Sequence, residues 1–110
     1  MADFRASATV AADGTASCVL TVSSPRVYYV VSQVSVMAPD VGGAASAGLY
    51  RDDMLITPLV PQGDAAAGDP PIDVRPGQRL TVDWAGGDQG AVCSALFMYE
   101  EVQFGQPARR

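Results

Sequence analysis

The sequence predicts an all-β fold, a single antiparallel β-sandwich of about eight strands with jelly-roll connections. Apolar residues recur with a spacing of two almost throughout, whereas an amphipathic helix would show a spacing of about 3.6. Clusters of Gly, Pro, Asp and Ser interrupt these apolar runs roughly every eight to twelve residues, which is typical of a sandwich or a barrel. Helix is therefore expected to be nearly absent.

The length and the composition predict one domain. The chain has 110 residues, of which 48% are hydrophobic and 17% are charged. A chain of this length buries roughly two-thirds of its unfolded surface, enough for one core without metals or several disulfides. One domain over residues 1–110 is expected, with a flexible tail at about residues 104–110.

The apolar runs and the turns between them place the strands. "AADGTA" contains Asp13-Gly14, a strong hairpin signal, so the strands on either side of it are expected to pair. Pro76-Gly77 is a turn dipeptide that separates two later strands. "PQGDAAAGDPP" is expected to be the longest and most mobile loop. The predicted strands are Phe4–Val10, Ala16–Val22, Val27–Met37, Ala47–Arg51, Leu55–Val60, Ile72–Arg75, Arg79–Trp84 and Ala91–Val102.

The alternation within each strand predicts the core. Leu80, Val82 and Trp84 share one face of their strand, which marks that face as the buried one. In "VYYVVSQVSVM", strict alternation places Val30 and Val34 on one side and Val31 on the other. The expected core residues are Leu20, Val30, Val34, Leu80, Val82, Trp84 and Leu96.

Two predicted strands, Val27–Met37 and Ala91–Val102, are apolar on both faces. Either long loops or a second layer cover their outer faces, or another copy of the protein does. If a second copy does, the sequence suggests an oligomer interface that draws on Tyr29, Val31, Phe97 and Tyr99.

Composition excludes several classes of function. The net charge is −5, with no Lys and no His. A nucleic-acid partner is not expected, because a surface that follows phosphates needs clustered basic residues. The missing His excludes Ser-His-Asp and Cys-His catalysis and imidazole metal sites. No apolar run approaches the ~18–20 residues of a membrane span, so no membrane partner is expected.

No catalytic residue, cofactor site or metal site is predicted. The loop carboxylates Asp52, Asp53, Asp64, Asp69 and Asp88 could bind calcium or a sugar, but their spacing matches no calcium loop and favours solvated turns. Neighbouring strand residues point to opposite faces, so Glu100 and Glu101 cannot act together on one bond. A sugar-stacking platform of Trp84 with Tyr28, Tyr29 and Tyr99 is the alternative to a core position for Trp84.

Cys18 and Cys93 are the only cysteines, and each lies in an apolar run. They are interpreted as reduced core residues, with a disulfide as the alternative. The beginning of the chain, "MADFRASATV", lacks the pattern of a secretion signal, so synthesis in a reducing, cytoplasmic compartment is expected.

A resemblance covers nearly the whole chain, from Ala6 to Val102. The order of "VYYVVSQVSV", "AGLYRDDMLI", a Gly/Asp loop and "PPIDVRPGQRLTVDWAGGDQGAVCSALFMYEEV" resembles small virion proteins of tailed phages that infect actinobacteria. The resemblance implies a jelly-roll decoration (cement) protein on the capsid exterior, with the major capsid protein as its partner. The alternative is a carbohydrate-binding or host-recognition module of the virion.

The capsid lattice also suggests an oligomeric state. Such a lattice has three-fold and quasi-three-fold positions, so a homotrimer that engages three capsid subunits at once is expected. Residues 40–45 or 62–69 are the alternative capsid contacts to the interface residues given above.

Overall fold

The computed structural model describes residues 2–104, with the backbone alone for residues 68–70. This part of the chain forms eight strands and no helix. No helix within it is long and apolar enough to cross a membrane. The strands are β1 (Ala2–Thr9), β2 (Ala16–Thr21), β3 (Val27–Met37), β4 (Ser46–Arg51), β5 (Met54–Leu59), β6 (Gly63–Val74), β7 (Arg79–Ala85) and β8 (Val92–Gln103).

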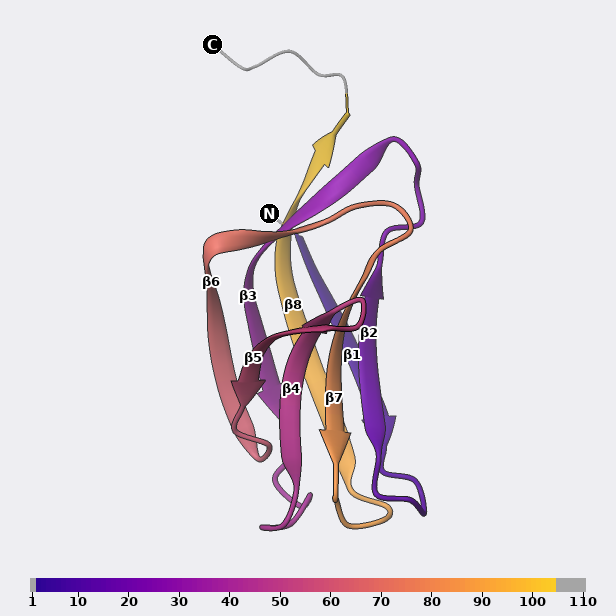
Figure 1. The fold of residues 1–110 in the computed structure, drawn as a ribbon, viewed down its shortest axis with the longest axis vertical. Coiled ribbons are helices and arrows are strands. Elements are labelled where there is room, and N and C mark those ends of the chain that lie inside the picture. The colour runs from indigo at the N-terminus through magenta and orange to yellow at the C-terminus, as the bar shows by residue number, and fades with distance from the viewer. Residues whose placement is uncertain (1, 105–110) are drawn as a thin grey trace.

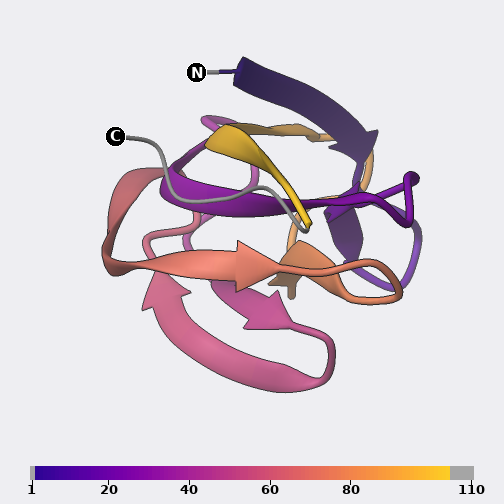
Figure 2. The ribbon, with the colours of Figure 1, turned by 90° about the horizontal axis from the view of Figure 1, so that it is seen from above.

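The strands form two antiparallel four-stranded sheets packed face to face (Figures 1 and 2). One sheet has the order β1-β8-β3-β6 and the other β2-β7-β4-β5. The chain passes from one sheet to the other at every connection except the β4–β5 hairpin, which is the jelly-roll pattern. The predicted fold class, a jelly-roll β-sandwich of about eight strands, is confirmed.

The β1–β2 connection differs from the prediction. The turn at Asp13-Gly14 joins them, and Gly14 has the positive φ of 84° that such a turn requires. The two strands nevertheless lie in different sheets, where β1 pairs with β8 and β2 pairs with β7. The predicted pairing of the first two strands is wrong. The hairpin signal predicts the turn, but it does not determine which strand each of the two pairs with.

The sixth strand is longer than predicted. The segment expected to be a mobile loop lies mostly within β6, which starts at Gly63 and not at Ile72. Small residues of this segment pair with β3, with Ala66 opposite Val34. The strand tolerates Gly and Pro because it is the edge of its sheet and needs hydrogen-bond partners on one side only. Residues 68–71 form its irregular part. They lie opposite Ser32 of β3, where the register shifts between the pairs Val31–Ile72 and Gln33–Ala67.

The bulge at Ser32 also corrects the predicted core. The register of β3 with both of its neighbours shifts between Val31 and Gln33. Residues before the bulge therefore face inward at odd positions such as Val31, whereas Val34 and Val36 face inward after it. Val30 is half-buried rather than buried, so its predicted core position is wrong.

Leu96 was also predicted in the core, and it is only half-buried because β8 places the odd-numbered residues inward. The other five predicted core residues are confirmed, each exposed by 2% or less: Leu20, Val34, Leu80, Val82 and Trp84. The indole Nε1 of Trp84 donates a hydrogen bond to the Pro61 carbonyl over 2.9 Å, which ties the β5–β6 turn to the core.

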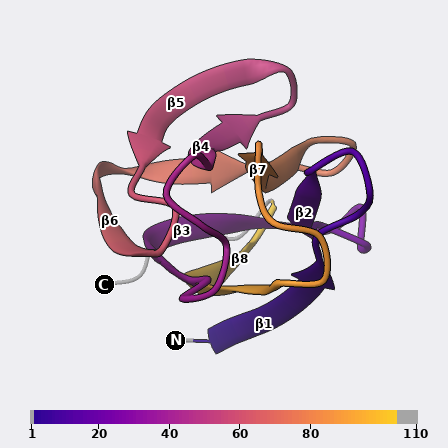
Figure 3. The same ribbon diagram turned by 90° about the horizontal axis from the view of Figure 1, so that it is seen from below.

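The loops at one end of the sandwich bind one another through their backbones (Figure 3). The Gly87 amide donates to the Gly14 carbonyl, and the Asp88 amide donates to the Val41 carbonyl, both over 2.9 Å. The β1–β2, β3–β4 and β7–β8 connections thus form one hydrogen-bonded set. The predicted tail begins at Phe104, whose amide donates to the Arg26 carbonyl, and its remainder lies outside the described residues.

Candidate functional site

The outer face of the β1-β8-β3-β6 sheet carries apolar side chains that no part of the described chain covers. In β8, Cys93, Ala95 and Phe97 point into the core, so their neighbours point outward. Met37 is 63% exposed and Val92 is 59% exposed. We call this surface the outer face and define it by Arg5, Val30, Gln33, Ser35, Met37, Val92, Ser94, Leu96 and Met98.

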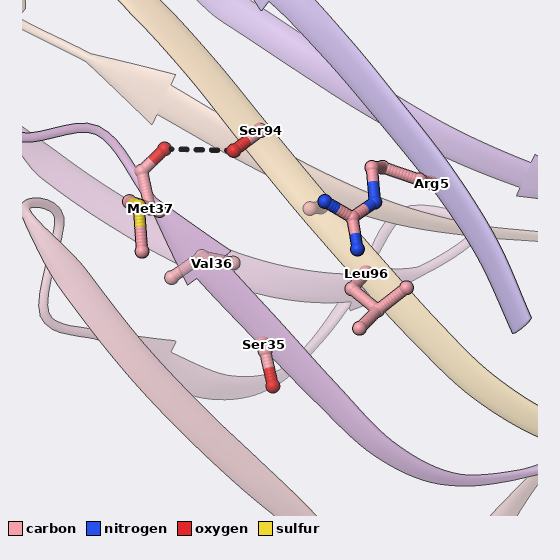
Figure 4. A pocket seen from close by; sticks show the side chains of 7 residues that line it. Arg5, Ser35, Val36, Met37, Ser94 and Leu96 are labelled. Atoms are coloured by element: carbon pink, nitrogen blue, oxygen red, sulfur yellow. Dashed lines mark hydrogen bonds between the residues drawn. The ribbon is translucent and has the colours of Figure 1, made fainter.

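A shallow depression lies on the outer face where β1, β8 and β3 meet. Figure 4 shows Met37 and Leu96 along it, with the Arg5 side chain extending across β8 from its strand. The Ser94 hydroxyl donates to the Met37 carbonyl over 3.3 Å. The depression measures about 200 Å³ and is lined by Arg5, Ser35, Val36, Met37, Ser94, Ala95 and Leu96.

The size and lining of this depression suit a side chain of a protein partner. Sites for small molecules are roughly 300–1,000 Å³ and enclose most of the ligand. This depression is smaller and open, with apolar walls, two hydroxyl groups and one guanidinium. It has room for one apolar side chain, and the Arg5 guanidinium at its edge is a donor that can pair with a carboxylate.

Tyr29 and Tyr99 lie together near the end of the sandwich opposite the hydrogen-bonded loops. Their rings stack with centroids 4.3 Å apart, and both residues are half-buried. Burial, and then the neighbouring Tyr29, raise the pKa of the Tyr99 hydroxyl. Both side chains pack against the core and keep part of their surface exposed.

The other two predicted interface residues are not available. Val31 and Phe97 are both 0% exposed and belong to the core. Their assignment to an oligomer interface is wrong, because a residue with no surface cannot contact a second chain while the fold is intact. The sequence showed two apolar faces on each strand but did not show which one the second sheet covers.

A group that the sequence did not reveal forms around Arg75. Its guanidinium lies 5.0 Å from the Tyr28 ring centroid and 5.6 Å from that of Phe104. The two rings are 5.0 Å apart, and the Asp73 carboxylate is 3.9 Å from Arg75. Tyr28 and Phe104 are far from Arg75 in the sequence, so no local spacing could have predicted the group. Trp84 is only 1% exposed, which confirms its predicted core position and rules out the alternative, a sugar-stacking platform that includes it.

The acidic residues considered for ligand binding mostly stabilise turns. Asp52 accepts a hydrogen bond from the Arg79 amide, and Asp64 accepts from the amides of Val60 and Ala65. Glu100 and Glu101 are exposed on opposite faces of β8. No three His, Cys, Asp or Glu residues of the described part could hold a metal ion together. The side chain of Asp69 lies outside the described residues.

Cys18 and Cys93 face each other across the core as free thiols. Cys18 Sγ donates a weak hydrogen bond to the Cys93 carbonyl over 3.9 Å. Burial, and then the neighbouring Cys93, raise the pKa of the Cys18 thiol to about 11, above the 9.0 of an exposed thiol. Burial also raises the pKa of Cys93.

We therefore predict that neither thiol reacts with an aromatic disulfide reagent in the native protein at about pH 8, where both are protonated and covered. Both should react after unfolding in guanidinium. Because the unfolded chain loses these protons first, stability is retained below about pH 9 and declines as the pH rises toward about 11. Cys18→Ala should make this decline shallower. Rapid labelling of the native protein at about pH 8 would contradict the buried positions.

Comparisons with known proteins add little to this geometry. No protein-family model matches the chain, and no curated protein matches it. Among solved structures, a similarity is found to the crystal structure of dimeric latent PorU from Porphyromonas gingivalis, with 10% identity and a TM-score of 0.37. That similarity covers 90% of this chain but only 13% of the PorU chain.

Proposed function

We propose that this chain is a non-enzymatic virion protein that decorates a phage capsid by binding the assembled major capsid protein through the outer face. The observation that carries the proposal is the exposed apolar surface around Met37 and Leu96, with its depression. The jelly-roll fold is common among viral capsid proteins, and the sequence resemblance described above leads to the same class. The protein is then located on the exterior of the capsid.

The outer face has the composition of a protein interface. Apolar Val30, Leu96 and Met98 lie among polar neighbours on this face, with Glu100 opposite Val30 and Asp3 opposite Met98. Surfaces where two proteins meet contain both kinds of residue. Met37, which is long and unbranched, can adapt to the partner surface.

Binding to several capsid subunits at once gives a higher total affinity than one small site can provide. A capsid presents many equivalent copies of its major protein, so linked copies of the decoration protein can bind several subunits at once. Each outer face then needs only a weak affinity for its own subunit.

We predict that Met37→Asp weakens binding to the capsid. The test is co-sedimentation with particles of the encoding phage that lack the protein. We expect the variant to lose at least about tenfold in affinity, because it replaces an exposed apolar side chain of the contact by a charge. Met54→Asp is the matched control, since Met54 is 69% exposed on the other sheet and should leave binding unchanged. Equal binding by wild type and Met37→Asp would contradict the outer face as the contact.

A second candidate function, glycan or host recognition, is favoured by the group around Arg75. Phe104 is 42% exposed there, and the Asp73 carboxylate lies in the same group. Sugars stack on such rings and donate hydrogen bonds to such carboxylates. Glycan binding that is lost in Phe104→Ala but kept in Met37→Asp would favour this candidate over decoration.

A further inference from the structure

The two sheets offer four edge strands, each with a partner strand on one side only. They are β1 and β6 in one sheet and β2 and β5 in the other. β5 is interrupted by a register shift and contains Pro58, and β6 by the irregular residues 68–71. Interruptions and prolines of this kind keep an edge from adding another strand.

β1 has no such interruption. It pairs with β8 in unbroken register over all eight of its residues, Ala2–Thr9, and contains no proline. β2 is also regular but is two residues shorter and carries no charge. β1 is therefore the longest uninterrupted edge of the sandwich, and Figures 2 and 3 show it at the outside of its layer.

The charged residues of β1 can pair with those of β1 in a second copy of the chain. Asp3 and Arg5 lie on the same face of the strand, opposite Met98 and Leu96 of β8. Both are exposed, and neither forms an ion pair with another described residue. Arg5 extends over β8 in Figure 4, but its long exposed side chain can turn to the free edge without losing an ion pair.

An antiparallel pair of β1 strands from two copies can satisfy these charges in one register. When the two-fold axis passes through Phe4, Asp3 of each copy lies directly opposite Arg5 of the other. An axis through Arg5 instead opposes two guanidinium groups, and an axis through Ala6 places Arg5 opposite Ser7. Charge complementarity selects the register centred on Phe4.

The inner face of the same strand supports this register. Phe4 points toward the core side, where its ring lies 6.2 Å from Phe97. It is nevertheless 40% exposed, because β1 ends the sheet and leaves one side of the ring uncovered. In the register centred on Phe4, the two Phe4 rings face each other across the axis and cover this exposed side.

We propose that β1 is a self-association strand, through which two copies of this chain pair antiparallel with Asp3 opposite Arg5. The pairing joins the two β1-β8-β3-β6 sheets into one continuous sheet across a two-fold axis. This inference does not depend on the proposed capsid function. It also differs from the trimer expected from the capsid lattice, because a self-complementary edge closes with two copies.

The first test is sedimentation equilibrium of the full chain from about 10 to about 500 µM, a range suited to a weak association. The mass is expected to rise from the monomer value of 11.4 kDa toward twice that value. A monomer mass at every concentration, or a trimer mass, would overturn the proposal.

Charge exchange tests the register. Asp3→Arg and Arg5→Asp should each weaken self-association by about tenfold, because each places like charges opposite each other twice. A mixture of the two variants should form a heterodimer, since every opposing pair is then complementary. The double variant D3R/R5D should self-associate like wild type for the same reason.

These variants lie on exposed positions, so their folding is expected to be unchanged, and thermal melting of each monomer serves as the control. The proposal is overturned if both single variants self-associate like wild type. It is also overturned if the mixture forms no heterodimer.

Discussion

Replacing Val82 by Asp is expected to abolish soluble expression. Val82 is 0% exposed at the centre of β7, between Cys18 of β2 and Leu49 of β4. A carboxylate there would have no cation beside it, and an unpaired buried charge costs several kcal/mol. The total stability of a domain of this size is roughly 5–15 kcal/mol, so the fold would not survive with useful yield.

The matched control is Val92→Asp, the same substitution on the outer face. Val92 is 59% exposed, so the new carboxylate stays in water and the variant should express and melt like wild type. Soluble yield and melting temperature of the two variants are the measurements. Normal yield of Val82→Asp would show that Val82 does not lie in the core.

Phe97→Ala is expected to lower the free energy of unfolding by about 3–5 kcal/mol. The ring is fully buried in β8, opposite Val34 of β3 and within aromatic contact of Phe4. Its removal leaves a cavity that the rigid strands on both sides cannot fill. Chemical denaturation gives the difference from the shift in midpoint at an unchanged slope.

Leu96→Ala provides the comparison in the same strand. Leu96 points to the outer face and is half-buried there, so its truncation should cost about 1 kcal/mol or less. Equal losses for the two variants would contradict the assignment of odd-numbered β8 residues to the core.

Much of the fold follows from local sequence signals. The alternation in β7 correctly placed Leu80, Val82 and Trp84 inside, since the strand is regular and one of its faces is polar. The turns at Gly14 and Gly77 were found because both require a positive φ that glycine adopts freely. Signals of this kind act over a few residues and need no knowledge of the partner strand.

The errors arise where long-range pairing decides the structure. Nothing in "VYYVVSQVSVM" marks the bulge at Ser32, which exchanges the inward and outward positions and moves Val30 out of the core. Likewise, β1 pairs with β8 at the other end of the chain, although the adjacent turn favoured β2. The alanines of β6 have low strand propensity and are held in place by pairing with β3.

The candidate site could be predicted only in part. The two apolar faces of β3 and β8 left open whether a second layer or another copy covers the outer one, and Tyr29 and Tyr99 keep exposed area. The depression was not found, because Arg5, Met37 and Leu96 come from three strands that only the folded sheet brings together. The position of the depression therefore depends on the strand order and not on any sequence motif.

The proposed function implies that a phage encodes this chain, and cryo-electron microscopy of the virions of that phage tests it most directly. We expect density for this eight-stranded sandwich on the capsid exterior, with Met37 and Leu96 of the outer face against the major capsid protein. Intact virions without this density on the shell, or a sandwich attached through the opposite sheet, would contradict it.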